Sequence, residues 1–375
     1  MRRVFGRDGQ TGAQAPVLLS ALWRGVLVVL KLVLIAGLLA CCPQSPVQPS
    51  RQAVRVSGLA FFSMPWQVQV ADLPVAGADG ITREQLQQRL QDRLDATNAV
   101  LSSYQPDTEV MRFNRQPPGV SVAISPLLSR GIARALSVSR ETQGAYDITI
   151  APLVNLWGFG PEARPERVPT AAAIADAQKQ VGWQHLQLKA SVLSKPSELR
   201  KDRPLTLDLS SIGEGLAVDE LAAELQRMGV RHALISVAGT LRSIGSGADG
   251  QPWPIAIERP DGSGAAEARL TLAAGVVSTS GSYRNYFERD GVRYSHTIDP
   301  ATGRPITHKG VSVTVVFPKG DDAALADAWA TAFNVLGPDR GLALATRKGM
   351  AVCYLEMSSS GLRRRISPAM RPLLP

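Results

Sequence analysis

Strand-like segments recur along most of this chain of 375 residues, and only a few segments have the periodicity of a helix. Residues 54–73 alternate irregularly between apolar and polar side chains, which predicts a pair of strands. The residues RDG at 289–291 predict a tight turn between two later strands. Because strands come in runs and helices are few, we expect an α+β fold. The expected domain covers residues 54–375 and has a mixed, mostly antiparallel sheet with a few flanking helices.

Capping signals place the expected helices. Thr82 and Gln85 form a capping-box pattern ahead of a helix that carries leucines along one face. A second helix is expected from Ser125 to Gly144, and a third over residues 170–182. The remaining expected elements are a loop over 101–119, strand-like backbone over 145–162, a hairpin over 185–193 and 204–209, a strand–turn–helix–strand unit over 207–239, a helix over 322–336 with a short one to 348, and a strand over 350–356.

The composition permits a packed core and argues against nucleic acid as a partner. Hydrophobic residues make up 45% of the chain, and the formal net charge is +9. Five basic residues and one acid lie in residues 1–40, so the rest of the chain carries a net charge of +5. No basic stripe interleaved with aromatic residues is present in the sequence. Cys353 lies in an apolar strand pattern and is expected to be a small core residue.

An apolar run with basic residues before and inside it ends at two adjacent cysteines, Cys41 and Cys42. The run is too short for a comfortable membrane span and is interrupted by Lys31, so it predicts a secretory signal over residues 1–40. The residues LLAC, which end at Cys41, resemble a bacterial lipobox, and this implies cleavage before Cys41 and its lipidation. The alternative is an ordinary signal peptide with incidental cysteines. Residues 41–53 are expected to form a flexible tether.

Two polar stretches lie where a scaffold could present them to a ligand. Asp147 stands between apolar neighbours, so its carboxylate needs a hydrogen-bond partner, a counter-charge or solvent. It is therefore either a structural acceptor or a ligand contact. Gly213 and Gly215 flank Glu214 just before an expected helix, where free backbone N–H groups would favour phosphate. The spacing is that of neither a dinucleotide fingerprint nor a P-loop.

Two further stretches combine residue types that suit proton transfer and metal binding. His296 follows the expected hairpin turn and precedes Asp299, so it is either a proton-transfer group or a hydrogen-bonded core imidazole. Asp327 and Thr331 are four residues apart on an expected helix and project from one face. A carboxylate and a hydroxyl without a nearby histidine or cysteine form a hard-oxygen set that suits Mg²⁺, although most such pairs bind nothing.

Taken in order, these segments resemble the ApbE family of flavin transferases, the FAD:protein FMN transferases. The resemblance extends from about Val54 to the C-terminus and implies a single domain of T-fold-like architecture. The segments that carry it are SMPW, LSSYQPDTEVMRFN, GAYDITIAPLVNLWGFGPE, LDLSSIGEGLAVDELA, STSGSYRNYFERDGVRYSHTIDPATGRPI and ADAWATAFNVLG.

Members of this family use Mg²⁺ to split FAD, release AMP and join FMN through a phosphoester to a threonine of a target protein. The resemblance therefore implies a transferase whose partner is an extracytoplasmic flavin-accepting subunit of a membrane electron-transfer complex. It also implies a lipoprotein held at the periplasmic face of the cytoplasmic membrane. An FAD pyrophosphatase that yields FMN and AMP, and a flavin-binding lipoprotein without catalysis, are the two alternatives.

The resemblance also implies roles for individual residues. His296 falls in the family's SHxIDP signature, and we expect it to transfer or orient a proton. Ala330 stands where some relatives have a second aspartate, and Pro65 stands where the family often has glycine. The positions implied to contact FAD are Met64, Tyr104, Ala145, Tyr146, Asp147, Asp208, Glu214 and Val277, and those implied to bind the metal are Ser211, Asp327 and Thr331.

A test of the anchor follows from the cysteine that ends the apolar run. We expect Cys41→Ser to release the protein from the membrane fraction while leaving its FMN transfer intact, because diacylglycerol on one cysteine buries enough CH₂ groups for stable attachment. Fractionation of cells that express either form, with Cys42→Ser as the matched control, measures this. An unchanged membrane fraction for Cys41→Ser would exclude lipidation at this residue.

Overall fold

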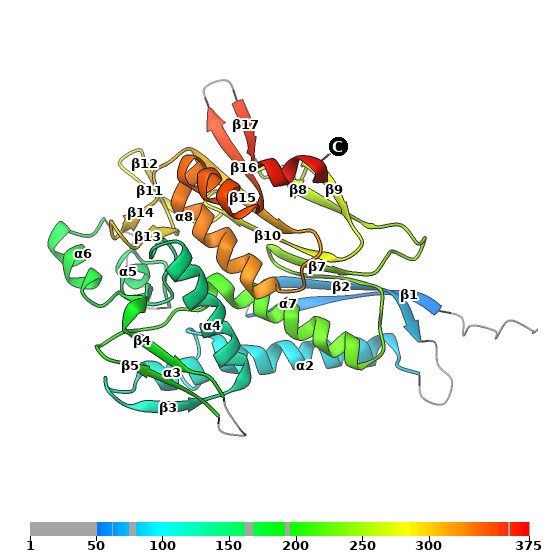
Figure 1. Cartoon of the computed structure of the whole chain (residues 1–375), viewed down its shortest axis with the longest axis horizontal. Coiled ribbons are helices and arrows are strands. Elements are labelled where there is room, and N and C mark those ends of the chain that lie inside the picture. The colour runs from blue at the N-terminus through cyan, green and yellow to red at the C-terminus, as the bar shows by residue number, and fades with distance from the viewer. Residues whose placement is uncertain are drawn as a thin grey trace, which may run out of the picture. The chain divides into compact units, whose positions relative to one another are not determined.

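An eight-stranded antiparallel sheet is the framework of the computed structural model (Figure 1), which describes residues 51–61, 63–74, 80–161, 168–191, 196–358 and 361–374. Its strand order is β1-β2-β6-β7-β10-β15-β16-β17. The expected signal segment, Cys41 and Cys42 lie outside the described residues. The sheet strands are β1 (Arg51–Ala60), β2 (Met64–Pro74), β6 (Ala233–Val237), β7 (Thr240–Ile244), β10 (Gly275–Gly281), β15 (Gly310–Phe317), β16 (Ala351–Ser358) and β17 (Gly361–Ile366).

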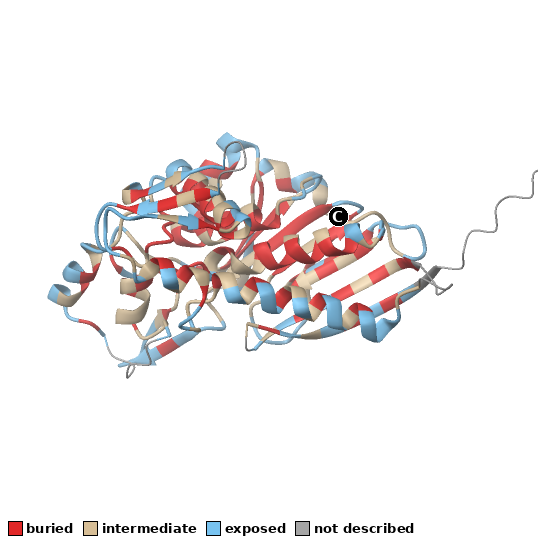
Figure 2. Cartoon of the chain, turned by 90° about the horizontal axis from the view of Figure 1, so that it is seen from below, coloured by how far each residue is buried: buried red, intermediate tan, exposed pale blue. Residues whose placement is uncertain are grey.

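Three helices cover one face of this sheet, and a hairpin packs on the other. The helices are α2 (Arg83–Leu101), α7 (Ser210–Arg227) and α8 (Ala323–Lys348). The opposite face is covered by the hairpin of β8 (Trp253–Glu258) and β9 (Ala266–Leu272) and by the 3₁₀ helix η2 (Pro368–Leu373). The central strands β10, β15 and β16 are therefore largely buried on both faces, as the red central strands in Figure 2 show, whereas β1 and β2 alternate between buried and exposed residues.

Strand β10 shows how the sheet divides its side chains between the two layers. Val276 packs with the helices, whereas Val277 packs with the β8–β9 hairpin. Ser278 is buried and points back to the helix side, where its hydroxyl meets α8. Because side chains alternate along a strand, Ser280 lies on the helix side as well.

A second group of elements packs beside the first around α4 (Pro126–Glu141). It contains the small sheet β3-β5-β4 and the short helices α3, α5 and α6, together with two hairpins, β11–β12 and β13–β14. The bounds are β3 Ser121–Ile124, β4 Leu186–Lys189, β5 Ser197–Lys201, β11 Tyr286–Arg289, β12 Val292–Ser295, β13 Ile298–Asp299, β14 Arg304–Pro305, α3 Glu109–Asn114, α5 Ala151–Leu156, α6 Ala171–Gln178 and η1 Trp183–His185.

The expected caps are present. The Thr82 hydroxyl accepts from Gln85 N, and the Gln85 side chain accepts from Thr82 N, which completes the capping box of α2. The hydroxyl of Ser125 caps α4 by accepting from Leu128 N, and that of Thr170 caps α6 by accepting from Ala173 N. The α+β class and the antiparallel hairpin β11–β12 are confirmed, and Cys353 is a buried free thiol in β16. None of the described helices is both long and apolar enough to cross a membrane.

Two segments that were expected to be strand-like are not. In 145–150 the Asp147 side chain accepts the backbone N–H of Thr149, so this polar turn competes with a sheet ladder, and α5 follows. In 204–209 the backbone of Leu207 bonds to the amide side chain of Asn114 instead of to a strand. The strand that pairs with β4 is β5, which lies before this segment.

Two other expectations were wrong in detail. The 101–119 segment contains the helix α3, which Thr108 caps. Residues 207–209 form no strand, so only the helix α7 and the strand β6 of the unit expected over 207–239 are present. The break expected between two helices near 322–348 is confirmed: α8 consists of two helical pieces separated at Gly337, which has φ 72° and is followed by Pro338.

Helices α7 and α8 touch at Gly215. A β-carbon at this position would lie 2.3 Å from the carbonyl oxygen of Ala323 and 2.6 Å from the Cα of Ala324. Both contacts are with backbone atoms, which no side-chain movement can relieve. Glycine is therefore required at 215 for the two helices to approach this closely.

The contact predicts a large cost for one added methyl group. We expect Gly215→Ala to destabilise the protein by about 3 kcal/mol, at the upper end of the usual cost of overpacking, because α8 must move away from α7. Gly213→Ala is the matched control: its β-carbon would meet nothing within 4 Å, so it should be neutral or slightly stabilising. Denaturant unfolding of both variants measures the difference, and equal stabilities would contradict the packing argument.

Candidate active site

Asp327 on α8 is a buried carboxylate at the contact with α7. Its Oδ2 accepts the backbone N–H of Gly215 at 2.9 Å, and its Oδ1 lies 3.4 Å from the hydroxyl of Ser278 on β10. Burial raises the pKa of Asp327 well above its usual value, and the nearby charge of Glu214 raises it further. Two acidic groups thus share one poorly solvated place between α7, α8 and β10.

Glu214 is the second member of this pair. Its Oε2 accepts the backbone N–H of Gly239 at 2.8 Å, in the turn that joins β6 to β7. Burial raises the pKa of Glu214 to about 7, although hydrogen bonds from Gly239 and Thr240 oppose the shift. Among the described residues, no lysine or arginine pairs with Glu214 or Asp327. The pair therefore lacks a positive partner in the part of the chain that the structure describes.

Gly213 and Gly215 are not placed as the phosphate hypothesis expects. Helix α7 begins at Ser210, so both glycines lie within its first two turns and not before it. The N–H group of Gly215 is already bonded to Asp327. The glycine segment thus positions the acidic pair and does not offer that N–H to an anion.

Ser211 and Tyr146 meet beside the acidic pair. The Ser211 hydroxyl donates to the Tyr146 hydroxyl at 3.0 Å. Burial raises the pKa of Tyr146 above its usual value, and the charges of Asp327 and Asp208 raise it further, which places this phenol within the electrostatic reach of both acids. Tyr146 therefore stays protonated and can donate a hydrogen bond.

Asp208 and Tyr104 lie on the solvent side of the cluster that Glu214, Asp327, Ser211 and Tyr146 form. The Oδ1 atom of Asp208 accepts both the backbone N–H and the hydroxyl of Ser210, at 2.9 and 2.5 Å, just before α7. The pKa of Tyr104 is raised by partial burial and by the charge of Asp208. Tyr104 is nevertheless 56% exposed, unusual for so large an aromatic side chain, so its ring faces solvent at the rim of the cluster.

Thr331 lies one helical turn after Asp327 on α8, as the sequence spacing predicts. Its hydroxyl is 3.4 Å from the hydroxyl of Ser280 on β10. Ser278 and Ser280 therefore face Asp327 and Thr331 in turn, with one serine opposite each. The two serines were not among the predicted site residues, although their spacing of two in a strand next to this helix could have indicated them.

His296 follows β12 and is held in one orientation. Its Nδ1 lies 3.0 Å from the carbonyl oxygen of Asn285, and its ring packs edge-on against Phe159. A carbonyl only accepts, so Nδ1 carries the proton and Nε2 of the neutral ring keeps its lone pair. Burial lowers the pKa of His296, which favours the neutral ring at physiological pH.

Two contacts join the histidine segment to the other site residues. The hydroxyl of Thr297, next to His296, accepts from the side chain of Asn334, three residues after Thr331 on α8. On the other side, the Tyr104 hydroxyl lies 3.5 Å from the carbonyl oxygen of Phe159, whose ring packs on His296. His296 is therefore linked through Thr297 to Asn334 of α8, and through Phe159 to the exposed Tyr104.

Both carboxylate oxygens of Asp147 accept hydrogen bonds from the protein. One carboxylate oxygen accepts the N–H and hydroxyl of Thr149, and the other accepts the N–H of Trp183 at 3.0 Å. Asp147 and Ala145 also line a cavity of about 290 Å³, whose other walls include Asp299 and Arg340. Neither Asp327 nor Glu214 lines this cavity. Asp147 thus serves as a structural acceptor at the edge of the cluster, and any contact it makes with FAD remains a prediction.

Met64 and Val277 differ in their relation to the cluster. Met64 begins β2, and the carbonyl of the next residue, Pro65, accepts from Ala238 in the turn that also binds Glu214. Met64 therefore lies next in sequence to a residue that bonds to this turn. The side chain of Val277 packs on the opposite face of the sheet, so only its backbone is available on the cluster side.

Ala330 is fully buried in the core beside α4, where an aspartate would be costly. The second carboxylate near Asp327 comes from α7 as Glu214, a pairing that the spacing on α8 does not reveal. In the described part of the chain, no three histidine, cysteine or acidic side chains form a cluster with metal-binding geometry.

Comparison with known proteins shows the family to which the chain belongs. Residues 62–354 match the model of the ApbE family. The chain is 40% identical to the FAD:protein FMN transferase of Klebsiella pneumoniae over 332 residues, 88% of this chain and 92% of that protein. The corresponding enzyme of Salmonella typhimurium is 40% identical over 90% of this chain and 95% of its own.

Solved structures agree on the fold. The flavinyl transferase ApbE of Pseudomonas stutzeri, in its apo form, superposes with a TM-score of 0.76 at 38% identity, covering 86% of this chain and 97% of that one. The flavin transferase ApbE of Vibrio cholerae gives 0.75 at 34% identity, over 87% and 100%. The family match covers most of the chain, and its relatives align along nearly their whole length: this chain belongs to the ApbE family.

Proposed function

We propose that this chain is an FAD:protein FMN transferase that moves FMN from FAD to a threonine of an acceptor protein and depends on Mg²⁺. Relatives of about 40% identity carry the name of this enzyme. The observation that supports the metal is the buried pair Asp327 and Glu214, to which no described residue supplies a basic partner. Two buried carboxylates at one place must either take up protons or be balanced by a cation, because a charge without a partner is costly in a poorly solvated site.

The side chains present fit a magnesium ion. Asp327, Thr331 and Ser211 offer the hard oxygens that Mg²⁺ prefers, and Glu214 adds negative charge beside them. Few protein carboxylates are available, so phosphate oxygens of the substrate would complete the coordination. When bound, the ion would neutralise the charge that develops on the pyrophosphate.

The transfer exchanges the phosphoanhydride bond of FAD for a phosphate ester on the acceptor. The acceptor threonine Oγ forms a bond to the phosphorus on the FMN side of FAD, and the P–O bond to AMP breaks, so AMP leaves with the bonding electrons. The threonine proton passes to a base. His296 suits this role, because its Nδ1–H is fixed on Asn285 and its Nε2 can accept.

The remaining cluster residues suit the binding of FAD. Tyr104 offers an exposed aromatic face on which a flat ring can stack, and Asp208 beside it can accept hydrogen bonds. Tyr146 donates from the buried side. Met64 adds an apolar, adaptable contact near the β6–β7 turn.

The place of action is part of the same proposal. The acceptor would be an extracytoplasmic flavin-carrying subunit of a membrane electron-transfer complex, and Cys41 would hold the enzyme by a lipid at the periplasmic face of the cytoplasmic membrane. The apolar run before Cys41 and the LLAC residues support this location.

One incubation separates the three activities considered. The purified protein is mixed with FAD, Mg²⁺ and a threonine-bearing acceptor domain, and the masses of all products are measured. FMN attached to the acceptor, with AMP released, supports the transferase. Free FMN and AMP with an unmodified acceptor would identify a pyrophosphatase, and unchanged FAD would identify a binder; either result would overturn the proposal.

The metal assignment predicts a separation of binding from transfer. We expect Asp327→Asn to lower the transfer rate at least about a hundredfold, because the ligand charge is lost, and to change FAD affinity only a few-fold, because the flavin contacts lie on other residues. Transfer rate against Mg²⁺ concentration, with FAD titration alongside, measures both. Asp176→Asn, an exposed acid on α6, is the control. Robust transfer by Asp327→Asn would contradict the assignment.

The acidic pair also predicts a pH dependence of stability without metal. The pKa of Glu214 is raised from 4.5 to about 7 in the folded protein, so its neutral form is favoured and stability is lost as pH rises through this window. We expect Glu214→Gln, which stays neutral, to gain stability over the wild type between pH 5 and 8, by up to about 3 kcal/mol in EDTA. Thermal unfolding across this range tests it, and a constant difference would contradict the buried charge.

A further inference from the structure

The first turn of α8 is capped from outside the helix. The first four N–H groups of a helix have no partner within it. In α8 the Asp219 carboxylate of α7 accepts two of them, Ala323 N and Ala324 N, both at 3.0 Å. The side chain of Asp322 accepts the third, from Leu325, and its carbonyl the fourth, from Ala326. The N-terminus of α8 is thus bonded to α7 as well as to its own cap.

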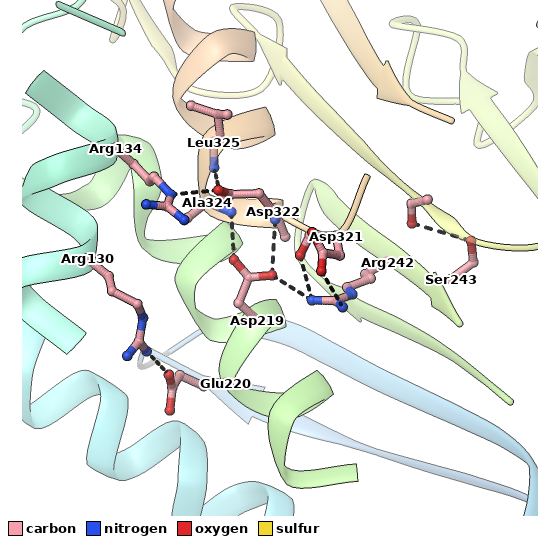
Figure 3. A network of polar contacts seen from close by, with 12 residues as sticks. Arg130, Arg134, Asp219, Glu220, Arg242, Ser243, Asp321, Asp322, Ala324 and Leu325 are labelled. Atoms are coloured by element: carbon pink, nitrogen blue, oxygen red, sulfur yellow. Dashed lines mark hydrogen bonds and ion pairs between the residues drawn. The ribbon is translucent and has the colours of Figure 1, made fainter. Parts of the chain in front are cut away.

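Two arginines from other elements complete this arrangement (Figure 3). Arg242 of β7 donates to Asp219 at 3.1 Å and to the carbonyl of Asp321 at 2.6 Å. Arg134 of α4 donates to Asp322 at 2.6 Å. The side chain of Arg242 is only 12% exposed, so its bonds are shielded from water. The start of α8 is therefore held by α4, α7 and β7 together.

Asp219 lies on the same face of α7 as the residues of the active site. Ser211, Gly215 and Asp219 are spaced by four residues and so lie along one side of the helix. Ser211 belongs to the site, Gly215 sets the distance between the helices, and Asp219 fixes the start of α8. Asp327 is one turn further along α8 from the atoms that Asp219 holds.

We propose that Asp219 is a positioning residue for the metal-binding face of α8: by binding the first turn of that helix, it sets the place of Asp327 opposite Glu214 and Ser211. This inference rests on the proposed function for the identity of the metal. It adds a residue that touches neither metal nor substrate and acts through the backbone of α8.

The neighbouring residue supplies a matched control. Glu220 is also a buried carboxylate of α7 paired with arginines, Arg93 and Arg130, but it faces α2 and α4 (Figure 3). Loss of its charge disturbs a comparable ion pair on the same helix without touching α8. Effects common to Asp219→Asn and Glu220→Gln therefore report on α7 in general, and effects of Asp219→Asn alone report on the start of α8.

The test measures metal dependence and local exchange in the purified protein. We expect Asp219→Asn to raise the Mg²⁺ concentration for half-maximal transfer by about 10- to 100-fold, as for other residues that orient metal ligands, while the rate at saturating Mg²⁺ recovers in part. FAD affinity without metal should stay within about twofold, because the flavin contacts lie on other residues. Glu220→Gln should leave the Mg²⁺ dependence unchanged.

Hydrogen–deuterium exchange supplies a readout that does not depend on catalysis. Asp219→Asn should speed exchange in a peptide that covers residues 321–327, and Glu220→Gln should not. Unchanged exchange there, or equal shifts in Mg²⁺ dependence for both variants, would overturn the positioning role. A wild-type protein that transfers no FMN, together with faster exchange in Asp219→Asn, would instead overturn the proposed function and leave Asp219 as the residue that fixes α8. Arg242→Lys, which keeps the charge, covers the case in which Asp219→Asn does not fold, with the same two outcomes.

Discussion

The backbone contact between α7 and α8 at Gly215 is the constraint on which the rest of the site depends. At this point the two helices are too close for any side chain, and the N–H group of Gly215 reaches the carboxylate of Asp327. The sheet beneath then brings Ser278 and Ser280 up to the same face of α8. A small change in the distance between the helices would move every oxygen of the cluster.

This packing has an electrostatic cost. Close helices bring Glu214 and Asp327 together where water is scarce, and neither acid has a basic partner among the described residues. The basic side chains nearby serve the ends and outer faces of the helices, as Arg242 does at Asp219 and Arg93 does at Glu220. The arrangement keeps α8 in place and leaves Glu214 and Asp327 as a buried acidic pair, which fits the magnesium ion that we propose there.

The sequence predicted best where the physics is local. The capping box at Thr82, the start of α4 at Ser125 and the RDG turn depend on neighbouring residues, and each forms as expected. The sequence predicted least well where a polar side chain bonds to backbone groups that a strand partner would otherwise bind. Asp147 and Asn114 bind the backbone of apolar segments that would otherwise have formed strands, and nothing in their local pattern reveals the competition.

The sequence by itself determined the family, the α+β class and the spacing that puts Asp327 and Thr331 on one helical face, because these follow from motifs and from the period of the helix. Only the tertiary structure decided that Glu214 is the second carboxylate beside Asp327, that Val277 faces away, and that Asp219 holds the start of α8. These relations join residues more than a hundred positions apart, or depend on which face of a sheet meets which helix. Chain spacing carries no information about either.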